Sequence, residues 1–271
     1  MITPKITTKF DHQSGSYLTI NSAKVYYEVI GQTVRNAPVM IVLHSSFSSM
    51  TEFNLITPKL TSAYQVIGID SRGHGKSTLG TEDVTFQLLQ EDVEAVIAHL
   101  NITEFSLLGN NAGGVVAYRL AAKLPSQVRD VTAISAFWNC HLLEDANQIS
   151  ASHKDGTWNN ANAEGLEAHT TLNPEPNAEA VAKAVSQMWV DCSPSGFPDQ
   201  RIAQITSPLL VVRGEQDLFV TEEHLTSLTA LVPSVSFLTI PTAGGNVIKD
   251  QTEIFLRHWD LFLTIDFPKR Y

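Results

Sequence analysis

The sequence predicts an α/β protein built on a doubly wound, mostly parallel sheet of eight strands with helices on both faces. Short apolar runs typical of strands alternate along the chain with longer segments of helical periodicity. Several of these runs are almost unbroken by polar residues, as in parallel strands that are covered on both faces. The chain has 271 residues, of which 43% are hydrophobic and 17% charged, so it is long enough to bury one large core.

The order of the expected elements starts with an antiparallel hairpin, since the β-rich runs 17–20 and 23–30 flank the turn pair Asn21-Ser22. Two buried parallel strands follow at 38–44 and 65–70. The other strands are expected at 105–108, 131–136, 208–212 and 235–240, and helices at 51–62, 85–100, 112–124, 221–231 and 251–263.

Residues 137–200 interrupt this alternation. The segment is rich in asparagine and proline, a composition that opposes a single long helix. It carries two lysines against nine acidic residues, and therefore most of the chain's net charge of −10. We expect a helical cap inserted into a core domain formed by residues 1–136 and 201–271.

Composition excludes several classes of function. With 18 basic and 28 acidic residues, the chain lacks the positive surface that nucleic-acid binding requires. No apolar run approaches the ~20 residues that span a bilayer, so no membrane partner is expected. Two cysteines, Cys140 and Cys192, are too few for a disulfide framework, and the first residues lack the apolar core typical of a signal peptide, so none is expected. A reducing cytoplasm is therefore the expected compartment.

Five motifs follow predicted strands in a fixed order. They are His44-Ser-Ser-Phe47, Asp70-Ser-Arg-Gly-His-Gly-Lys-Ser77, Leu107-Leu-Gly-Asn-Asn-Ala-Gly-Gly114, Val212-Arg-Gly-Glu-Gln-Asp217 and Ile240-Pro-Thr-Ala-Gly-Gly-Asn246. Together they resemble the α/β-hydrolase superfamily, in particular its small capped esterase, lactonase and peroxidase-like branch, over roughly residues 24–265.

The third motif corresponds to the nucleophile elbow, G-x-S-x-G, in which a serine sits on a sharp turn between strand and helix. Here Asn111 takes the place of the serine. An amide is not an activatable hydroxyl or thiol, so covalent catalysis by the family route is lost. Asparagine tolerates a positive φ, so the elbow is expected to keep its shape. Asn111 is then either only a suitable turn residue or a residue whose amide binds a ligand.

The resemblance also assigns the acid and the base of the triad. Asp217 falls at the position of the acid, although an aspartate there is equally able to cap the helix that follows. Gly245 falls where the histidine is expected, and a shift of one residue puts Asn246 there instead. Neither residue accepts a proton at a useful pKa, so nucleophile and base are both absent.

The oxyanion hole implied by the resemblance uses backbone N–H groups, which substitutions leave in place. Its donors are expected to be Ser46 and Ala112. Ser45 stands where the family commonly has glycine, and its hydroxyl is a poor nucleophile without a base.

Other histidines are weak substitutes for the missing base. His44 and His74 are expected to hold loops, and His153 and His169 in the insertion are expected to be solvated. No histidine spacing resembles a zinc site, and no metal or cofactor is expected.

Aromatic side chains on the insertion and facing loops predict an apolar pocket, although most of them are expected to fasten the insertion to the core. The candidate ligand-binding residues are Ser45, Phe47, Trp138, Trp158, Trp189, Phe219 and Asn246. The partner is expected to be a small molecule, and the chain a monomer or homodimer.

Three functions remain open at this point. The first is a protein that binds a small apolar carbonyl or carboxylate ligand with little or no hydrolysis. The second is an altered or inactivated version of an ester- or lactone-type serine hydrolase. The third is a lyase, isomerase or cyclase that uses the same pocket without a covalent intermediate.

Overall fold

The computed structural model describes residues 7–32, 37–140, 163–217 and 220–264. A single sheet of eight strands runs through it in the order β1-β2-β4-β3-β5-β6-β7-β8. The strands are β1 (Ser16–Ile20), β2 (Ala23–Gly31), β3 (Val39–Leu43), β4 (Gln65–Ile69), β5 (Phe105–Asn110), β6 (Val128–Ile134), β7 (Leu209–Gly214) and β8 (Ser236–Ile240). In this spatial order, the neighbouring strands from β4 to β8 pair in parallel. By contrast, β2 pairs antiparallel with both β1 and β4. The predicted eight-stranded, mostly parallel sheet is confirmed.

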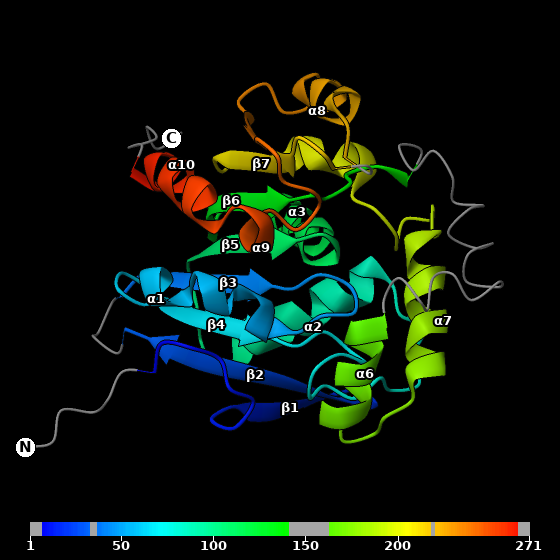
Figure 1. Cartoon of the computed structure of the whole chain (residues 1–271). Helices are drawn as coiled ribbons and strands as arrows, with labels where there is room; N and C mark the ends of the chain where they lie inside the picture. Colours follow the sequence, from blue (N-terminus) through cyan, green and yellow to red (C-terminus); the bar gives the residue numbers. More distant parts are fainter. Residues whose placement is uncertain (1–6, 33–36, 141–162, 218–219, 265–271) are drawn as a thin grey trace, which may run out of the picture.

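Helices cover both faces of this sheet (Figure 1). They are η1 (Met50–Leu55), α1 (Thr57–Leu60), α2 (Phe86–His99), α3 (Ala112–Lys123), α6 (Ala163–Leu172), α7 (Ala178–Trp189), η3 (Asp199–Gln204), α8 (Glu222–Thr229), α9 (Val247–Asp250) and α10 (Thr252–Thr264). In place of the helix expected at 51–62, a 3₁₀ helix and a single α-turn form. Pro58 explains the break, because it lacks the N–H that a continuous helix needs there.

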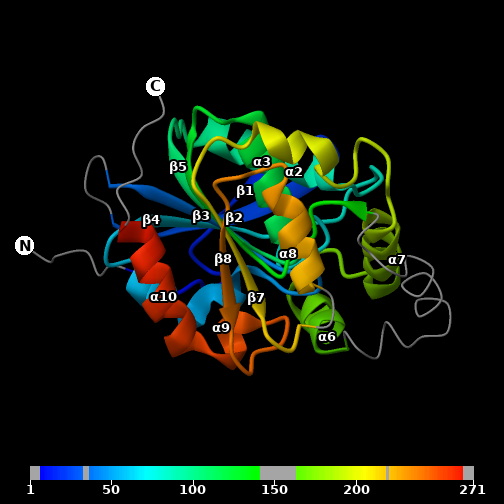
Figure 2. The ribbon, with the colours of Figure 1, turned by 90° about the horizontal axis from the view of Figure 1, so that it is seen from above.

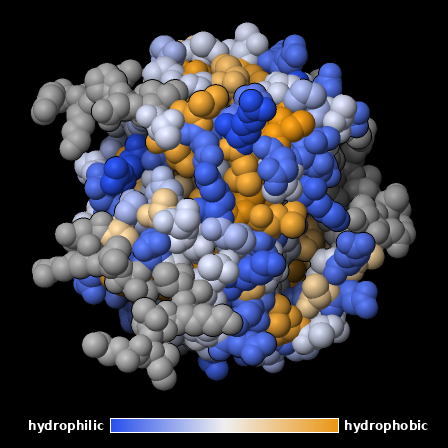
Figure 3. All heavy atoms as spheres, turned by 60° about the vertical axis from the view of Figure 1, so that its left-hand side comes forward, coloured by the Kyte–Doolittle hydropathy of each residue, from blue (hydrophilic) through white to orange (hydrophobic). Residues whose placement is uncertain are grey.

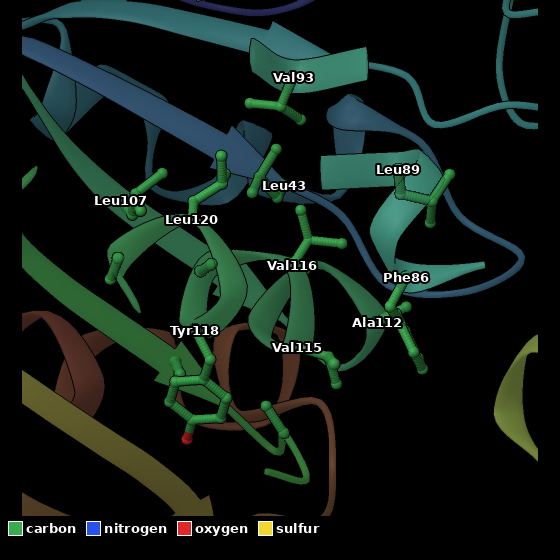
Figure 4. Close-up of a cluster of buried hydrophobic side chains, with 14 of the residues drawn as sticks. Leu43, Phe86, Leu89, Val93, Leu107, Ala112, Val115, Val116, Tyr118 and Leu120 are labelled. Atoms are coloured by element: carbon green, nitrogen blue, oxygen red, sulfur yellow. The ribbon is translucent and has the colours of Figure 1, made fainter. Parts of the chain in front are cut away.

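Alternating side chains of the strands divide the core into two layers. Ile41 and Leu43 of β3 belong to the layer shared with α2 and α3, whereas Met40 and Val42 face the layer of η1, α9 and α10. Figure 4 shows side chains of α2, α3, β3 and β5 turned toward one another in the first layer. Because both faces are buried, the central strands are apolar throughout, as their sequences predict.

The surface carries both hydrophobic and hydrophilic side chains. On one face, hydrophobic side chains lie between hydrophilic ones (Figure 3). Among the described residues, no helix is long and apolar enough to cross a membrane.

The segment between β6 and β7, which we call the insertion (residues 137–200), contains α6 and α7 in its described part. Both helices lie beyond the carboxyl ends of the central strands in two perpendicular views (Figures 1 and 2). Two separate helices agree with a composition that opposes one long helix.

A disulfide joins the two cysteines of the chain. Cys140 follows the end of β6 and Cys192 follows α7, with their Cα atoms 5.5 Å apart. The low cysteine count suggested a reducing compartment, but because the two residues are paired, the count no longer supports that expectation.

Candidate functional site

The turn between β5 and α3 carries Asn111. Its φ of 51° and ψ of −113° place it at positive φ, as predicted for the elbow position. Its N–H donates to the carbonyl oxygen of Ile134 at 2.8 Å, which ties the turn to the end of the neighbouring strand. The residue tolerates this backbone because a short amide side chain adopts positive φ more readily than most others.

Glycines let the elbow approach the sheet closely. A Cβ at Gly113 would lie 2.0 Å from the carbonyl oxygen of Leu43, and one at Gly109 would lie 2.3 Å from that of Gly113. Gly113 N–H also donates to the carbonyl oxygen of His44 at 3.1 Å. The first turn of α3 is thereby held against the loop that follows β3.

That loop brings Ser46 next to Asn111. The backbone N–H of Ser46 donates to Oδ1 of Asn111 at 3.4 Å. The N–H of Ala112, the first residue of α3, donates to none of the residues that the structure describes. The two N–H groups that the resemblance assigns to an oxyanion hole thus lie beside one side-chain amide.

Ser45 points to a carboxylate that sequence analysis did not single out. Its hydroxyl donates to Oε2 of Glu52 at 2.6 Å, and its N–H donates to Oε1 at 3.2 Å. Asn110 Nδ2 donates to the same Oε1 at 3.1 Å. No sequence signal marks Glu52, because it lies in an expected helix with nothing to distinguish it from a solvated residue.

Asp217 and Gly245 lie on the loops that follow β7 and β8. Oδ1 of the buried Asp217 accepts from the N–H of Val220 at 3.1 Å. A Cβ at Gly245 would lie 3.9 Å from that same oxygen, and no other described atom outside its chain neighbours lies within 4 Å. Asn246, the alternative to Gly245, instead accepts from the N–H of Lys249 and caps α9.

The histidines hold loops together. His44 Nε2 accepts from the N–H of Ser71 at 2.9 Å, and His74 Nδ1 lies 2.8 Å from the carbonyl oxygen of Arg72. Burial lowers the pKa of His74 to about 3, with the nearby His44 ring acting in the same direction, so it is neutral at pH 7. Nδ1 therefore carries the proton, and Nε2 is an acceptor with no hydrogen-bond partner among the described residues.

His169 was expected to be solvated, and that expectation is wrong. The side chain is 5% exposed, and its Nε2 accepts from the N–H of Asn177 at 2.9 Å. Burial lowers its pKa, opposed by the backbone carbonyl of Gly73. His169 lies in the last turn of α6 and accepts from the residue that caps α7, so it packs these two helices of the insertion together; His153 lies outside the described residues.

Two of the three predicted aromatic ligand residues that the structure describes, Trp138 and Trp189, pack the insertion against the core. Trp138 Nε1 donates to the carbonyl oxygen of His224 at 3.4 Å, and Trp189 Nε1 donates to Oγ of Ser46 at 2.9 Å. Both indoles are buried. Trp158 and Phe219 lie outside the described residues.

A cavity of about 240 Å³ lies beside the loop that follows β3. Phe47 and His74 line it from the core, and Gly165, Leu166 and His169 line it from the insertion. Of the candidate ligand-binding residues, Phe47 alone is in the described lining. Among the described residues, no group of three or more His, Cys, Asp or Glu is arranged to hold a metal ion.

Comparison with known proteins agrees with this geometry. The family described as alpha/beta hydrolase fold matches residues 38–174, about half of the chain. The chain belongs to the α/β-hydrolase fold family. The match spans the His44 loop, the elbow at Asn111 and the start of the insertion.

Relatives across the α/β-hydrolase family cover most of the chain. A Haemophilus influenzae protein named as an esterase/lipase is 26% identical over 88% of this chain and 86% of its own length. The 2-(acetamidomethylene)succinate hydrolase of Mesorhizobium japonicum is 24% identical over 82% of this chain and 86% of its own. A carboxylesterase structure from Nitrososphaera gargenis superposes with a TM-score of 0.76 at 17% identity, covering 92% of this chain and 99% of that one, and so shows the shared fold.

Proposed function

We propose that this α/β-hydrolase-fold chain binds a small apolar ligand with a carbonyl or carboxylate group and does not hydrolyse it through an acyl-enzyme. The observation that carries the proposal is Asn111 on the elbow, with its Oδ1 on the N–H of Ser46. An amide has no activatable nucleophile, and Gly245 offers no base. The triad is therefore reduced to its acid, Asp217.

Retained N–H groups support binding of a carbonyl or carboxylate oxygen. The N–H groups of Ser46 and Ala112 are the proposed donors, and a ligand oxygen would replace Asn111 Oδ1 on the first of them. The relatives named as an esterase/lipase and as 2-(acetamidomethylene)succinate hydrolase support a ligand of this class. We further propose that the insertion acts as a cap, because α6 and the core line the same cavity.

The decisive experiment follows product release by the native chain with p-nitrophenyl acetate, alongside labelling by a fluorophosphonate and intact-mass measurement. We expect no burst and no adduct, while calorimetry with a panel of aryl and alkyl carboxylates yields a saturable ligand. A burst equal to the enzyme concentration would overturn the proposal. Peptide mapping would then locate the adduct, with Ser45 as the first candidate because Glu52 accepts its proton in a 2.6 Å hydrogen bond.

A second candidate is an altered serine hydrolase whose chemical groups were replaced in an otherwise intact site. The open space at Gly245, with its Cβ position 3.9 Å from Asp217 Oδ1, favours it. A histidine side chain introduced at Gly245 would begin near the Asp217 carboxylate, which would orient its imidazole. Restoring the serine and the histidine together tests this candidate.

A further inference from the structure

A second cavity, of about 250 Å³, lies between α2, α3 and η3. Its lining shares no residue with the cavity beside Phe47. Arg119, Lys123 and Arg201 contribute three cationic side chains to it, and Gln87, Gln90 and Gln204 contribute carboxamides. This concentration of positive charge is unexpected in a chain with a net charge of −10.

Arg119 uses two of its three guanidinium nitrogens to donate to the protein. The side chain is 5% exposed; its Nε donates to Oε1 of Gln90 at 2.9 Å, and its Nη1 donates to the carbonyl oxygen of Gly196 at 2.6 Å. Nη2 donates to no described residue, and no described carboxylate forms an ion pair with this guanidinium. Its charge is therefore uncompensated by a direct partner.

Arg201 on η3 is held in a similar way. Its Nε donates to the carbonyl oxygen of Pro198 at 3.0 Å and its Nη2 to that of Phe197 at 2.7 Å. Nη1 donates to no described residue, and again no described carboxylate forms an ion pair with it. Lys123 differs, because its Nζ lies 3.0 Å from Oε2 of Glu94.

The two guanidinium groups lie close enough to repel each other. Burial, and then the charge of Arg201, lower the pKa of Arg119 to about 10. The carboxylates of Glu91, Asp191 and Asp199 act in the opposite direction without pairing directly. Because a guanidinium group carries its charge at neutral pH, the cavity holds two like charges that an anion would neutralise.

We propose that this cavity binds a small oxyanion, a phosphate or carboxylate group, between Nη2 of Arg119 and Nη1 of Arg201. Planar guanidinium groups donate to oxyanions in charge-assisted hydrogen bonds, and each of these two cavity-lining arginines has an Nη atom that donates to no described residue. The carboxamide of Gln204 is neutral, so it adds a donor without opposing charge, whereas Gln87 Nε2 already donates to Oε1 of Glu91 at 2.9 Å. This site is independent of the function proposed for Asn111.

The test measures binding of inorganic phosphate and of citrate by titration calorimetry, each at low ionic strength. For wild type we expect saturable binding of at least one of them, and the stronger of the two identifies the preferred oxyanion geometry. Arg201→Gln should weaken binding about tenfold or more, and Arg201→Lys less, because it keeps the charge but loses the fork. Arg129→Gln is the matched control, an exposed arginine that faces Glu104 outside the cavity.

Two results would overturn the proposal. One is a wild-type chain that binds neither anion; the other is an Arg201→Gln variant that binds with wild-type affinity. Arg201 also donates to two backbone carbonyls, so near-ultraviolet circular dichroism checks that each variant is folded. If Arg201→Gln does not fold, Arg201→Lys decides, since it must then bind more weakly than Arg129→Gln.

Discussion

Oδ1 of Asn111 accepts a hydrogen bond from the backbone N–H of Ser46 at 3.4 Å. The side chain that replaces the nucleophile thus presents its own carbonyl oxygen to a proposed oxyanion donor. A substrate carbonyl would have to displace it before it could be polarised there. Under the proposed function, Asn111 acts against hydrolysis in two ways, because it supplies no nucleophile and occupies a proposed donor.

Restoring the chemical groups is expected to restore activity. Asn111→Ser combined with Gly245→His should hydrolyse p-nitrophenyl acetate measurably above the native chain, whereas each single change should do little, because serine and histidine act as a unit. Initial rates with purified variants check this. Adding Asp217→Asn to the double variant is the control and should lower kcat by about 10⁴-fold.

An inert double variant with unchanged stability would reject the altered-hydrolase candidate. It would leave ligand binding without acyl transfer as the better-supported function. A double variant that gains activity which Asp217→Asn does not reduce would show that the new activity bypasses the triad geometry.

The elbow glycine should be intolerant of a side chain. Gly113→Ala places a Cβ 2.0 Å from the carbonyl oxygen of Leu43, and backbone on both sides cannot yield without separating α3 from β3. We expect a loss of about 3 kcal/mol or more in the free energy of unfolding. Gly244→Ala is the matched control, since its Cβ meets only Asp250 Oδ2, at 3.4 Å, and should change stability by about 0.5 kcal/mol or less. Urea titrations that rank the two alike would contradict this assignment.

His74 should make the fold sensitive to acid. Its pKa is lowered to about 3 in the folded chain, against about 6.5 when unfolded, so the unfolded state binds the extra proton between these values. Stability therefore falls as the pH drops below about 6.5, by up to about 1.4 kcal/mol per pH unit from this residue. His74→Gln should flatten that dependence in urea titrations at pH 7.5, 6 and 5. Equal slopes for variant and wild type would show that His74 does not titrate in this way.

Reduction of the disulfide should destabilise the chain. Cys140 and Cys192 are 52 residues apart, and closing a loop of that length stabilises a fold by about 4 kcal/mol through the unfolded state. Unfolding curves with and without a phosphine reductant measure the difference. The double variant Cys140→Ser, Cys192→Ser should resemble the reduced protein and no longer respond to reductant. Two free thiols in the denatured, unreduced chain would contradict the pairing.

The order of elements was accessible from sequence because apolar runs and helical stripes are local properties. The hairpin, the central strands and α2 and α3 all follow that pattern, and the positive φ of Asn111 follows from its place in the motif. Pro58 stands inside the helix expected at 51–62, and its missing N–H divides that segment into η1 and α1. Contacts between distant segments were not accessible, and the pairing of Cys140 with Cys192 is an example. The hydrogen bond of Ser45 to Glu52 is closer in sequence, but it depends on how the loop after β3 turns back on η1. The burial of His169 likewise depends on the helix packed against it.

The disulfide also determines which products form when a protease cleaves the insertion. Cys140 and Cys192 stand near the two ends of this segment, so the intervening chain forms a covalent ring attached to the core. A protease that cleaves once inside the ring opens it but releases no fragment. A nicked molecule would keep its mass apart from one added water, and its pieces would separate on a gel only after reduction. Electrophoresis without reduction therefore underreports damage to this part of the protein.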